Sequence, residues 1–396
     1  MRLELHEVAR RLIAFDTVST RSNADAMAYL ADCLDRPGVR VALQRFDWNG
    51  IEGVNLLASA GPPEPDGLVI SGHVDTVPFR DQPGWTRDAL VFEVDATTAY
   101  GRGASDMKGF VAQCVTMASM LDVGRLTRPL VLAFTAAEEV GSRGAHALVR
   151  ELPALLSDVP APRLAWIGEP TSSQIFHAHK GIVYFEVVVR GTGGHAGRPD
   201  HGVNAIVVAA EVVDRIGRYQ EEIRAGEGDA VTFPDCPYPT LNVGTIRGGT
   251  ATNIIAEECR IEVSYRPLPG QDPRAIHRAI ARRLGDIDGH DRSGSSGRAT
   301  IVVGEPRVVA ALQTPRGTRL ERALLDVLGE RPVVGAPFAT DGSELASAGI
   351  DSLICGPGDL DQAHQPNEGI DRRAFEDGPA VVRAVVERLC TGSGDV

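Results

Sequence analysis

The sequence predicts an α/β protein with a mainly parallel central sheet flanked by helices, and a second, smaller α+β domain inserted into it. The first observation is a series of short apolar runs bounded by glycine, proline or polar turn residues, which is typical of buried strands. The second is helical apolar spacing between those runs, since alternating strands and helices favour a parallel sheet. The third is a change of pattern after about Gly181, to strand, helix, strand, strand and helix.

The elements of the first domain follow from the local pattern of apolar residues. Apolar residues at three- and four-residue spacing predict amphipathic helices at 4–14, 24–34, 107–122 and 142–151. Continuous apolar runs predict buried strands at 68–70, 130–134 and 164–167. In a parallel sheet, ligands bind beyond the carboxyl ends of the strands, so we expect a site at that edge.

The inserted domain is predicted to span 181–291. Its predicted elements are strands at 182–190, 241–246 and 254–265 and helices at 203–224 and 272–285. A Gly- and Ser-rich segment from Gly285 to Gly297 is expected to return the chain to the first domain. That domain would comprise 1–180 and 292–396, and its last part would contain a strand at 299–303, helices at 316–328 and 372–390, and a strand ending near Cys355.

The composition excludes several classes of protein. A chain of 396 residues with 43% hydrophobic content can bury a large core, and its net charge of -13 gives no positive surface for nucleic acid or for an anionic membrane. The six cysteines contain no CxxC pair, which favours reduced thiols. The first residues contain no export signal, and no apolar run is long enough to span a bilayer. We therefore expect a cytoplasmic protein.

His73 and Asp75 follow the strand at 68–70, in the segment SGHVDTVP. An imidazole that binds a metal usually donates its second ring N–H to a carboxylate, and Asp75 is placed to accept it. Taken alone, the pattern His-x-Asp also fits a structural hydrogen-bonded pair.

Asp106 lies in the glycine-rich segment GRGASDMKG, directly before a predicted helix. Glycines let the backbone approach an ion closely, and a carboxylate can bridge two metals with its two oxygens. The alternative is that Asp106 is only the N-cap of the helix. Nucleotide binding is disfavoured, because the segment lacks the full GxGxxG or GxxxxGK[ST] spacing.

Adjacent acids, Glu138 and Glu139, follow the strand at 130–134. One could bind a metal while the other takes a proton from bound water. They could also be two exposed acids in the first turn of a helix. Glu169 and His364 each lie near a Gly- or Pro-rich turn, and the whole set of two histidines and three carboxylates suits a pair of Zn²⁺ ions, with Co²⁺ or Mn²⁺ as substitutes.

Five motifs match a known family in order and spacing: SGHVDTVP, GRGASDMKGF, AAEEVGS, GEPTS and CGPGDLDQAH. Over nearly its whole length the chain resembles the M20 family of metallopeptidases and deacylases. The segments HKG at 179–181, GVNAI at 202–206, RGGT at 247–250 and YRPLPG at 265–270 look most like acetylornithine deacetylases. Departures from that group lie at 338–344 and in the loop 198–201.

The resemblance implies a zinc-peptidase-like catalytic domain, with 181–291 as a lid and dimerisation domain and a homodimer as the assembly. It implies that Asp106 bridges two zinc ions, with His73 and Glu169 at one ion and Glu139 and His364 at the other. Asp75 would orient His73 and Glu138 would be the general base. His195 would polarise the oxyanion, often in the partner's site, and Asn253 and Arg266 would hold the substrate carboxylate.

The implied reaction is metal-dependent hydrolysis of an N-acyl amino acid by a zinc-bridged water. We expect N-acetylornithine, which would yield ornithine and acetate. A carboxypeptidase, a dipeptidase and an N-succinyl-diaminopimelate desuccinylase remain alternatives, because the same ligands serve all of them. A non-catalytic binding protein is a further alternative. Arg266 favours a carboxylate substrate, since a guanidinium can grip a carboxylate with two parallel hydrogen bonds, although it could also form a surface ion pair.

Overall fold

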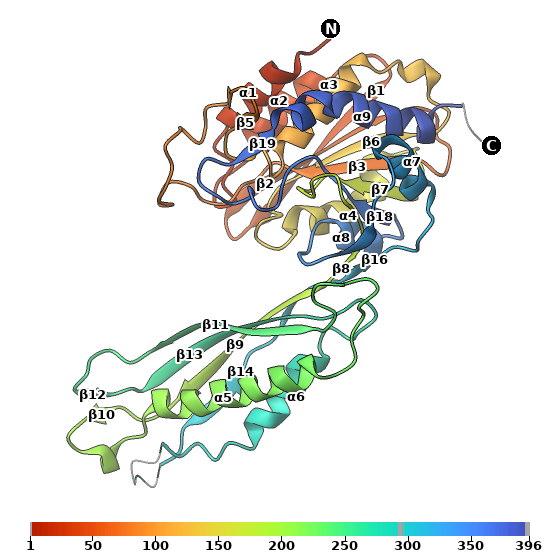
Figure 1. Cartoon of the computed structure of the whole chain (residues 1–396). Helices are drawn as coiled ribbons and strands as arrows, with labels where there is room; N and C mark the ends of the chain where they lie inside the picture. The colour runs from red at the N-terminus through yellow and green to blue at the C-terminus, as the bar shows by residue number, and fades with distance from the viewer. Residues whose placement is uncertain (1, 292–294, 296, 393–396) are drawn as a thin grey trace. The chain divides into compact units, whose positions relative to one another are not determined.

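The computed structural model describes residues 2–291, 295 and 297–392, which form two compact units (Figure 1). Unit 1 contains Met1–Ala178, Leu312–Val334 and Thr340–Val396. Unit 2 contains His179–Ala311 and Gly335–Ala339. Each unit has its own hydrophobic core. No helix among the described residues has the length and apolar character needed to cross a bilayer.

The main sheet of unit 1 has a parallel centre. Its strands lie in the order β1-β2-β6-β3-β7-β18-β8-β16, and β17 also pairs with β8. The four central strands β6, β3, β7 and β18 run parallel, whereas β1, β2 and β8 pair antiparallel with their neighbours. The bounds are β1 Val39–Trp48, β2 Ile51–Ala60, β3 Leu68–His73, β6 Leu130–Thr135, β7 Leu164–Ile167, β8 Ile175–His179, β16 Leu312–Gln313, β17 Val333–Ala336 and β18 Asp351–Ile354.

Helices cover both faces of this sheet (Figure 1). The helices α1 Leu5–Ala14, α2 Ala24–Leu34, α3 Lys108–Met120, α7 Arg319–Leu328 and α9 Arg372–Cys390 form one layer, and α4 Arg143–Leu156 and α8 Gly342–Ser347 lie on the other side. Because both faces are covered, β3, β6 and β7 are buried at every position, which explains their continuous apolar runs. A small separate sheet contains β4 Glu93–Val94, β5 Thr98–Tyr100 and β19 Gly369–Asp371.

The main sheet of unit 2 is covered on one face by two helices (Figure 1). Its strands lie in the order β11-β13-β9-β14, and β15 pairs with β9. The bounds are β9 Ile182–Arg190, β11 Thr240–Gly248, β13 Glu258–Arg266, β14 Thr300–Val303, β15 Arg307–Val309, α5 Ala205–Arg224 and α6 Ala275–Gly285. Alternate residues of β9, among them Val183, Phe185 and Val187, point into the core beneath the helices.

The predicted fold class, an α/β unit with a parallel sheet centre and an α+β unit of β-α-β-β-α order, is confirmed. Two details of this assignment differ. The strand at 300–303, assigned above to the first domain, pairs with β9 in unit 2. The strand predicted at 254–265 is two strands, the short β12 Ile254–Ile255 and β13, which pair with different neighbours. The Gly- and Ser-rich return segment lies partly outside the described residues.

The β1–β2 hairpin is the third difference, because the sequence analysis did not predict it. Its two-residue turn, Asn49-Gly50, has positive φ at both positions, 51° and 79°. This is the backbone of a type I′ turn, and Asn-Gly is its strongest sequence signal. The hairpin was therefore readable from the dipeptide.

Candidate metal centre

The predicted ligands of unit 1 converge at one edge of its sheet. His73 is the last residue of β3, Glu138 and Glu139 follow β6, and Glu169 follows β7. These three strands are parallel neighbours, and His73 stands beside Thr135 of β6 in the register. Parallel neighbours end at the same edge, so their following residues lie close together, as expected from the sequence.

One group of three ligands contains His73, Asp106 and Glu169. The Nε2 of His73 lies 3.1 Å from Asp106 Oδ1 and 3.8 Å from Glu169 Oε2. All three residues are buried, and their ligand atoms lie within 4.8 Å of one another. The spacing is small enough for one cation to contact all three.

A second group contains Asp106, Glu139 and His364. The Nε2 of His364 lies 3.1 Å from Asp106 Oδ2 and 3.1 Å from Glu139 Oε1. Asp106 therefore belongs to both groups and presents one carboxylate oxygen to each. The loop before Asp106 depends on Gly103, whose φ of 87° favours glycine.

The contacts of His73 require a proton or a metal ion between its Nε2 and Asp106. Its Nδ1 lies 2.9 Å from the backbone carbonyl oxygen of Asp75, and a carbonyl can only accept, so Nδ1 carries the proton. A neutral His73 then directs the lone pair of Nε2 at the carboxylate oxygen of Asp106. Two electron pairs at 3.1 Å repel unless a proton or a metal ion lies between them.

The shifted pKa values of these ligands also reflect the crowding of carboxylates at the site. Burial would lower the pKa of His73, but hydrogen bonds with Asp106 and Glu169 raise it well above its usual value. Burial raises the pKa of Glu169 to about 7, and burial followed by the charge of Asp106 raises the pKa of Glu139. Without metal ions, the cluster must hold extra protons. Divalent cations would replace them.

A metal pair fits the residues present. The Oε1 of Glu169 is buried and has no hydrogen-bond partner among the described residues, which is costly unless something else contacts this oxygen. The donor set of two imidazoles and three carboxylates is one that Zn²⁺, Co²⁺ and Mn²⁺ accept.

Asp75 anchors the turn that follows β6. Its Oδ1 accepts from the backbone nitrogen of Glu138 at 3.1 Å, and its Oδ2 accepts from that of Glu139 at 3.2 Å and from Ser19 Oγ at 2.7 Å. The ring of His73 is held mainly by the carbonyl of Asp75, since the carboxylate Oδ1 lies 3.7 Å from Nδ1. The role expected for the Asp75 carboxylate differs: the backbone carbonyl of Asp75 accepts from His73, and the carboxylate holds the turn at Glu138 and Glu139.

Glu138 lies beside the two groups but belongs to neither. Burial, followed by the charge of Glu169, raises its pKa well above the usual value. A further acid, Asp341, lies at this site and was not predicted as a site residue. It is buried, Thr135 Oγ1 donates to its Oδ2 at 2.6 Å, and its charge acts on Glu138. Asp341 comes close to β6 only through folding, because the two are far apart in the chain. The sequence shows the segment Thr-Asp-Gly around Asp341 but not its neighbours in the fold.

The structure decides against two of the alternative interpretations. The residue at the N-cap of α3 is Met107, which makes no side-chain capping bond, and the carboxylate of Asp106 faces the histidines instead. The helix α4 begins only at Arg143, so Glu138 and Glu139 lie in the preceding turn and not in a first helical turn.

The other predicted site residues, His195, Asn253 and Arg266, lie in unit 2. His195 is exposed in β10 Gly194–His195, which pairs with β12, and the backbone nitrogen of Ala196 donates to the carbonyl of Asn253 at 3.0 Å. Arg266 ends β13, and its Nη1 is buried with no hydrogen-bond partner among the described residues.

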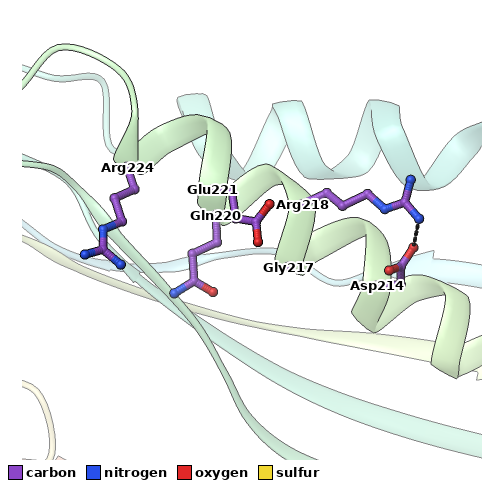
Figure 2. A pocket seen from close by; sticks show the side chains of 6 residues that line it. All are labelled: Asp214, Gly217, Arg218, Gln220, Glu221 and Arg224. Carbon is purple, nitrogen blue, oxygen red and sulfur yellow. Dashed lines mark ion pairs between the residues drawn. The ribbon is translucent and has the colours of Figure 1, made fainter.

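A hollow of about 450 Å³ over α5 is a weaker candidate. Figure 2 shows that its lining side chains come from this one helix, and that Asp214 and Arg218 form an ion pair across one turn, at 3.0 Å. These two side chains are exposed, and no predicted site residue lines the hollow. It has none of the convergent buried groups of the candidate metal centre.

Comparison with known proteins agrees with this two-unit design. Residues 177–292 match the model of the peptidase dimerisation domain of the M20 type, and residues 55–160 match that of peptidase family M28. An M20-family metallo-carboxypeptidase from Sulfolobus solfataricus superposes with a TM-score of 0.76 at 18% identity, over 98% of this chain and 99% of that one. The fold is that of the M20 metallopeptidases.

Two further structures share the M20 fold. Human carnosine dipeptidase 1 superposes with a TM-score of 0.72 at 18% identity, over 97% of this chain and 96% of that chain. A dinuclear metal-binding M20 peptidase from Bacillus subtilis superposes with a TM-score of 0.64 at 14% identity, over 96% of each chain. The matched segment 55–160 begins within β2 and ends after α4, so it contains His73, Asp106 and the two acids after β6.

Proposed function

We propose that this protein is a metal-dependent amidohydrolase that binds two divalent ions at the candidate metal centre and cleaves a small N-acyl amino acid. The observation that carries the proposal is the shared carboxylate of Asp106, which faces a different histidine with each oxygen. A site for a single metal ion would need only one of the two ligand groups that share Asp106. Two metal ions would polarise the amide carbonyl and bring the pKa of a bound water from about 15.7 towards 7.

Glu138 is the proposed general base. It lies next to the ligands without joining either group, so its carboxylate is available to accept a proton and return it. It would take the proton of the attacking water and deliver it to the departing amine nitrogen. Asp75 would hold Glu138 in place through the backbone hydrogen bond described above.

Arg266 is the residue proposed to bind the substrate carboxylate. A buried guanidinium nitrogen without a partner is unusual, and a carboxylate would satisfy it with a charge-assisted bond. An N-acyl amino acid has such a carboxylate next to the scissile amide. N-acetylornithine is the first substrate to test, with zinc as the first metal and cobalt and manganese as substitutes.

His195 and Asn253 are proposed to act in the site of a partner chain. The strand β13 separates Arg266 from the end of the sheet near β10 and β12, and its nine residues span about 26 Å at roughly 3.3 Å per residue. One small substrate cannot contact Arg266 and His195 of the same chain over that distance. A homodimer in which the partner supplies His195 and Asn253 resolves this, and the match to a peptidase dimerisation domain supports it.

Peptide hydrolysis is the second candidate, because two of the structural neighbours are a carboxypeptidase and a dipeptidase. The test is a substrate panel with zinc-loaded protein. It contains N-acetylornithine, other N-acetyl amino acids, N-succinyl-diaminopimelate and dipeptides, and release of free amine is measured. Preference for an N-acetyl amino acid supports the first candidate, and preference for dipeptides supports the second. Metal-loaded protein that cleaves none of them would contradict the proposal.

A further inference from the structure

Glu368 is buried beside the candidate metal centre but belongs to neither ligand group. Its Oε1 accepts hydrogen bonds from three backbone nitrogens, those of Gly103 at 3.0 Å, Ser105 at 2.9 Å and Asp106 at 2.9 Å. One carboxylate oxygen thus holds the whole loop that presents Asp106.

The second oxygen of Glu368 begins a chain of contacts to the other ligand loop. Arg102, 1% exposed, donates from Nη1 to Glu368 Oε2 at 2.7 Å and from Nη2 to Gln82 Oε1 at 2.6 Å. Gln82 in turn donates from Nε2 to the backbone carbonyl of His364 at 2.6 Å. The contacts therefore run without a break from the amide of Asp106 to the carbonyl of His364.

The fold explains how Glu368 reaches this place. It directly precedes β19, which pairs antiparallel with β5, so that Gly369 stands beside Tyr100. The backbone nitrogen of Gly101 also donates to the carbonyl of Glu368, at 3.0 Å. The short β5–β19 ladder thus brings the glycine-rich loop and the segment after His364 together.

We propose that Glu368 is a positioning residue which, with Arg102 and Gln82, holds Asp106 and His364 at metal-binding distance from each other. This inference rests on the proposed function. Both ligands lie on loops outside regular structure, and the carboxylates of Asp106 and Glu139 repel each other when no cation is bound. A scaffold that keeps the ligands in place beforehand reduces the cost of binding. Loss of such a supporting contact typically weakens metal affinity by about 10- to 100-fold.

Stability alone is a poor explanation for the buried pair of Glu368 and Arg102. Desolvation of two charges offsets most of their attraction, and apolar replacements of buried pairs are often neutral or stabilising. The test must therefore separate metal affinity from stability. The chain offers a matched control in Glu321, which is 5% exposed, pairs with Arg316 and accepts from the backbone nitrogen of Gly317.

The experiment titrates metal-free protein with Zn²⁺ against a chelating indicator and records the melting temperature of each variant. In Glu368→Gln we expect at least a tenfold rise in Kd for both ions, because the amide can no longer pair with Arg102. In Gln82→Ala we expect a similar rise for one ion only, since this contact holds the His364 loop alone. In the control Glu321→Gln we expect a lower melting temperature and unchanged affinities.

Unchanged zinc affinities in folded Glu368→Gln would overturn the inference. If that variant does not fold, Gln82→Ala decides, and unchanged affinities there would have the same meaning. Wild-type protein that binds no zinc would overturn the proposed function as well. If wild-type protein binds two ions and the variants, like Glu321→Gln, lose only melting temperature and keep their zinc affinities, the positioning role alone is overturned.

Discussion

Asp106 faces His73 through only one of its carboxylate oxygens, Oδ1, at 3.1 Å from Nε2. Its Oδ2 lies at the same distance from the Nε2 of His364. Burial would raise the pKa of this aspartate, but the two histidines lower it well below its usual value, so that it stays charged. A charged carboxylate shared between two imidazoles is the structural basis of the metal-binding predictions below.

Replacing Asp106 should affect both ions, whereas replacing His73 should affect mainly one. Asp106→Ala removes an oxygen from each ligand group, so we expect the dialysed protein to retain almost no zinc. His73→Ala leaves the group of Asp106, Glu139 and His364 intact. Elemental analysis after dialysis gives the metal content. Two ions per chain in folded Asp106→Ala would contradict the bridging role.

Glu138→Gln should separate catalysis from metal binding. The amide cannot accept a proton, so we expect turnover to fall by roughly 10²- to 10⁴-fold while both ions remain. Glu344→Gln is the control, because Glu344 lies on α8, its carboxylate contacts the exposed His146, and it belongs to neither ligand group. Steady-state rates and metal content are measured together. Near wild-type turnover in Glu138→Gln would remove the base assigned here.

Zinc affinity should rise with pH. Hydrogen bonds with Asp106 and Glu139 raise the pKa of His364 to about 10 in the metal-free protein, so near neutrality its ring carries a proton that a metal must displace. The raised pKa stabilises the metal-free fold below the unfolded value, about 6.5, and this contribution is lost as the pH rises towards 10.

For the ion at His364, displacement of one proton should strengthen the apparent affinity about tenfold per pH unit between roughly pH 6 and 7.5. Chelator competition at three pH values measures the slope. Calorimetry in buffers of different ionisation enthalpy counts the protons released. An affinity that does not change with pH would mean that His364 is already neutral.

Arg266→Ala should weaken substrate binding through the carboxylate. Loss of a charge-assisted hydrogen bond costs about 1.5–3 kcal/mol, which corresponds to roughly 10- to 150-fold in kcat/KM and should appear mainly in KM. The control is Arg260→Ala on the same strand, where Arg260 is exposed and paired with Glu186 and Glu258. A substrate whose carboxylate is replaced by an amide should lose the same factor with wild-type protein and little more with Arg266→Ala.

Mixing two inactive variants should restore activity if His195 acts in the partner's site. His195→Ala keeps Glu138, and Glu138→Gln keeps His195, so a mixed dimer contains one complete site. After subunit exchange at equal concentrations, we expect about a quarter of the wild-type activity. Sedimentation verifies the dimer. A mixture of exchanged dimers without activity would place His195 outside the partner's site.

The sequence was sufficient to predict the residues that follow strand ends. His73, Glu139 and Glu169 come directly after apolar runs that form buried parallel strands, so their convergence follows from the sheet. His364 does not directly follow such a run, and it was predicted as a metal ligand through the resemblance to the M20 motifs. Local pattern also identified α1, whose apolar residues face the core.

Other contacts could not be predicted, because they join segments far apart in the chain. Glu368 contacts Asp106 across 262 positions, and Thr135 contacts Asp341 across 206. A carboxylate that accepts from backbone nitrogens leaves no pattern in the side chains of its partners. The strand at 300–303 was assigned to the wrong unit for a related reason, since its place depends on pairing with β9 and not on its own composition.

Anomalous diffraction at the zinc edge from crystals of zinc-loaded protein tests the central claim most directly. Our account predicts two peaks per chain, one beside each carboxylate oxygen of Asp106, with His73 and Glu169 at the first and Glu139 and His364 at the second. A single peak, or peaks at which Asp106 contacts neither ion, would contradict it.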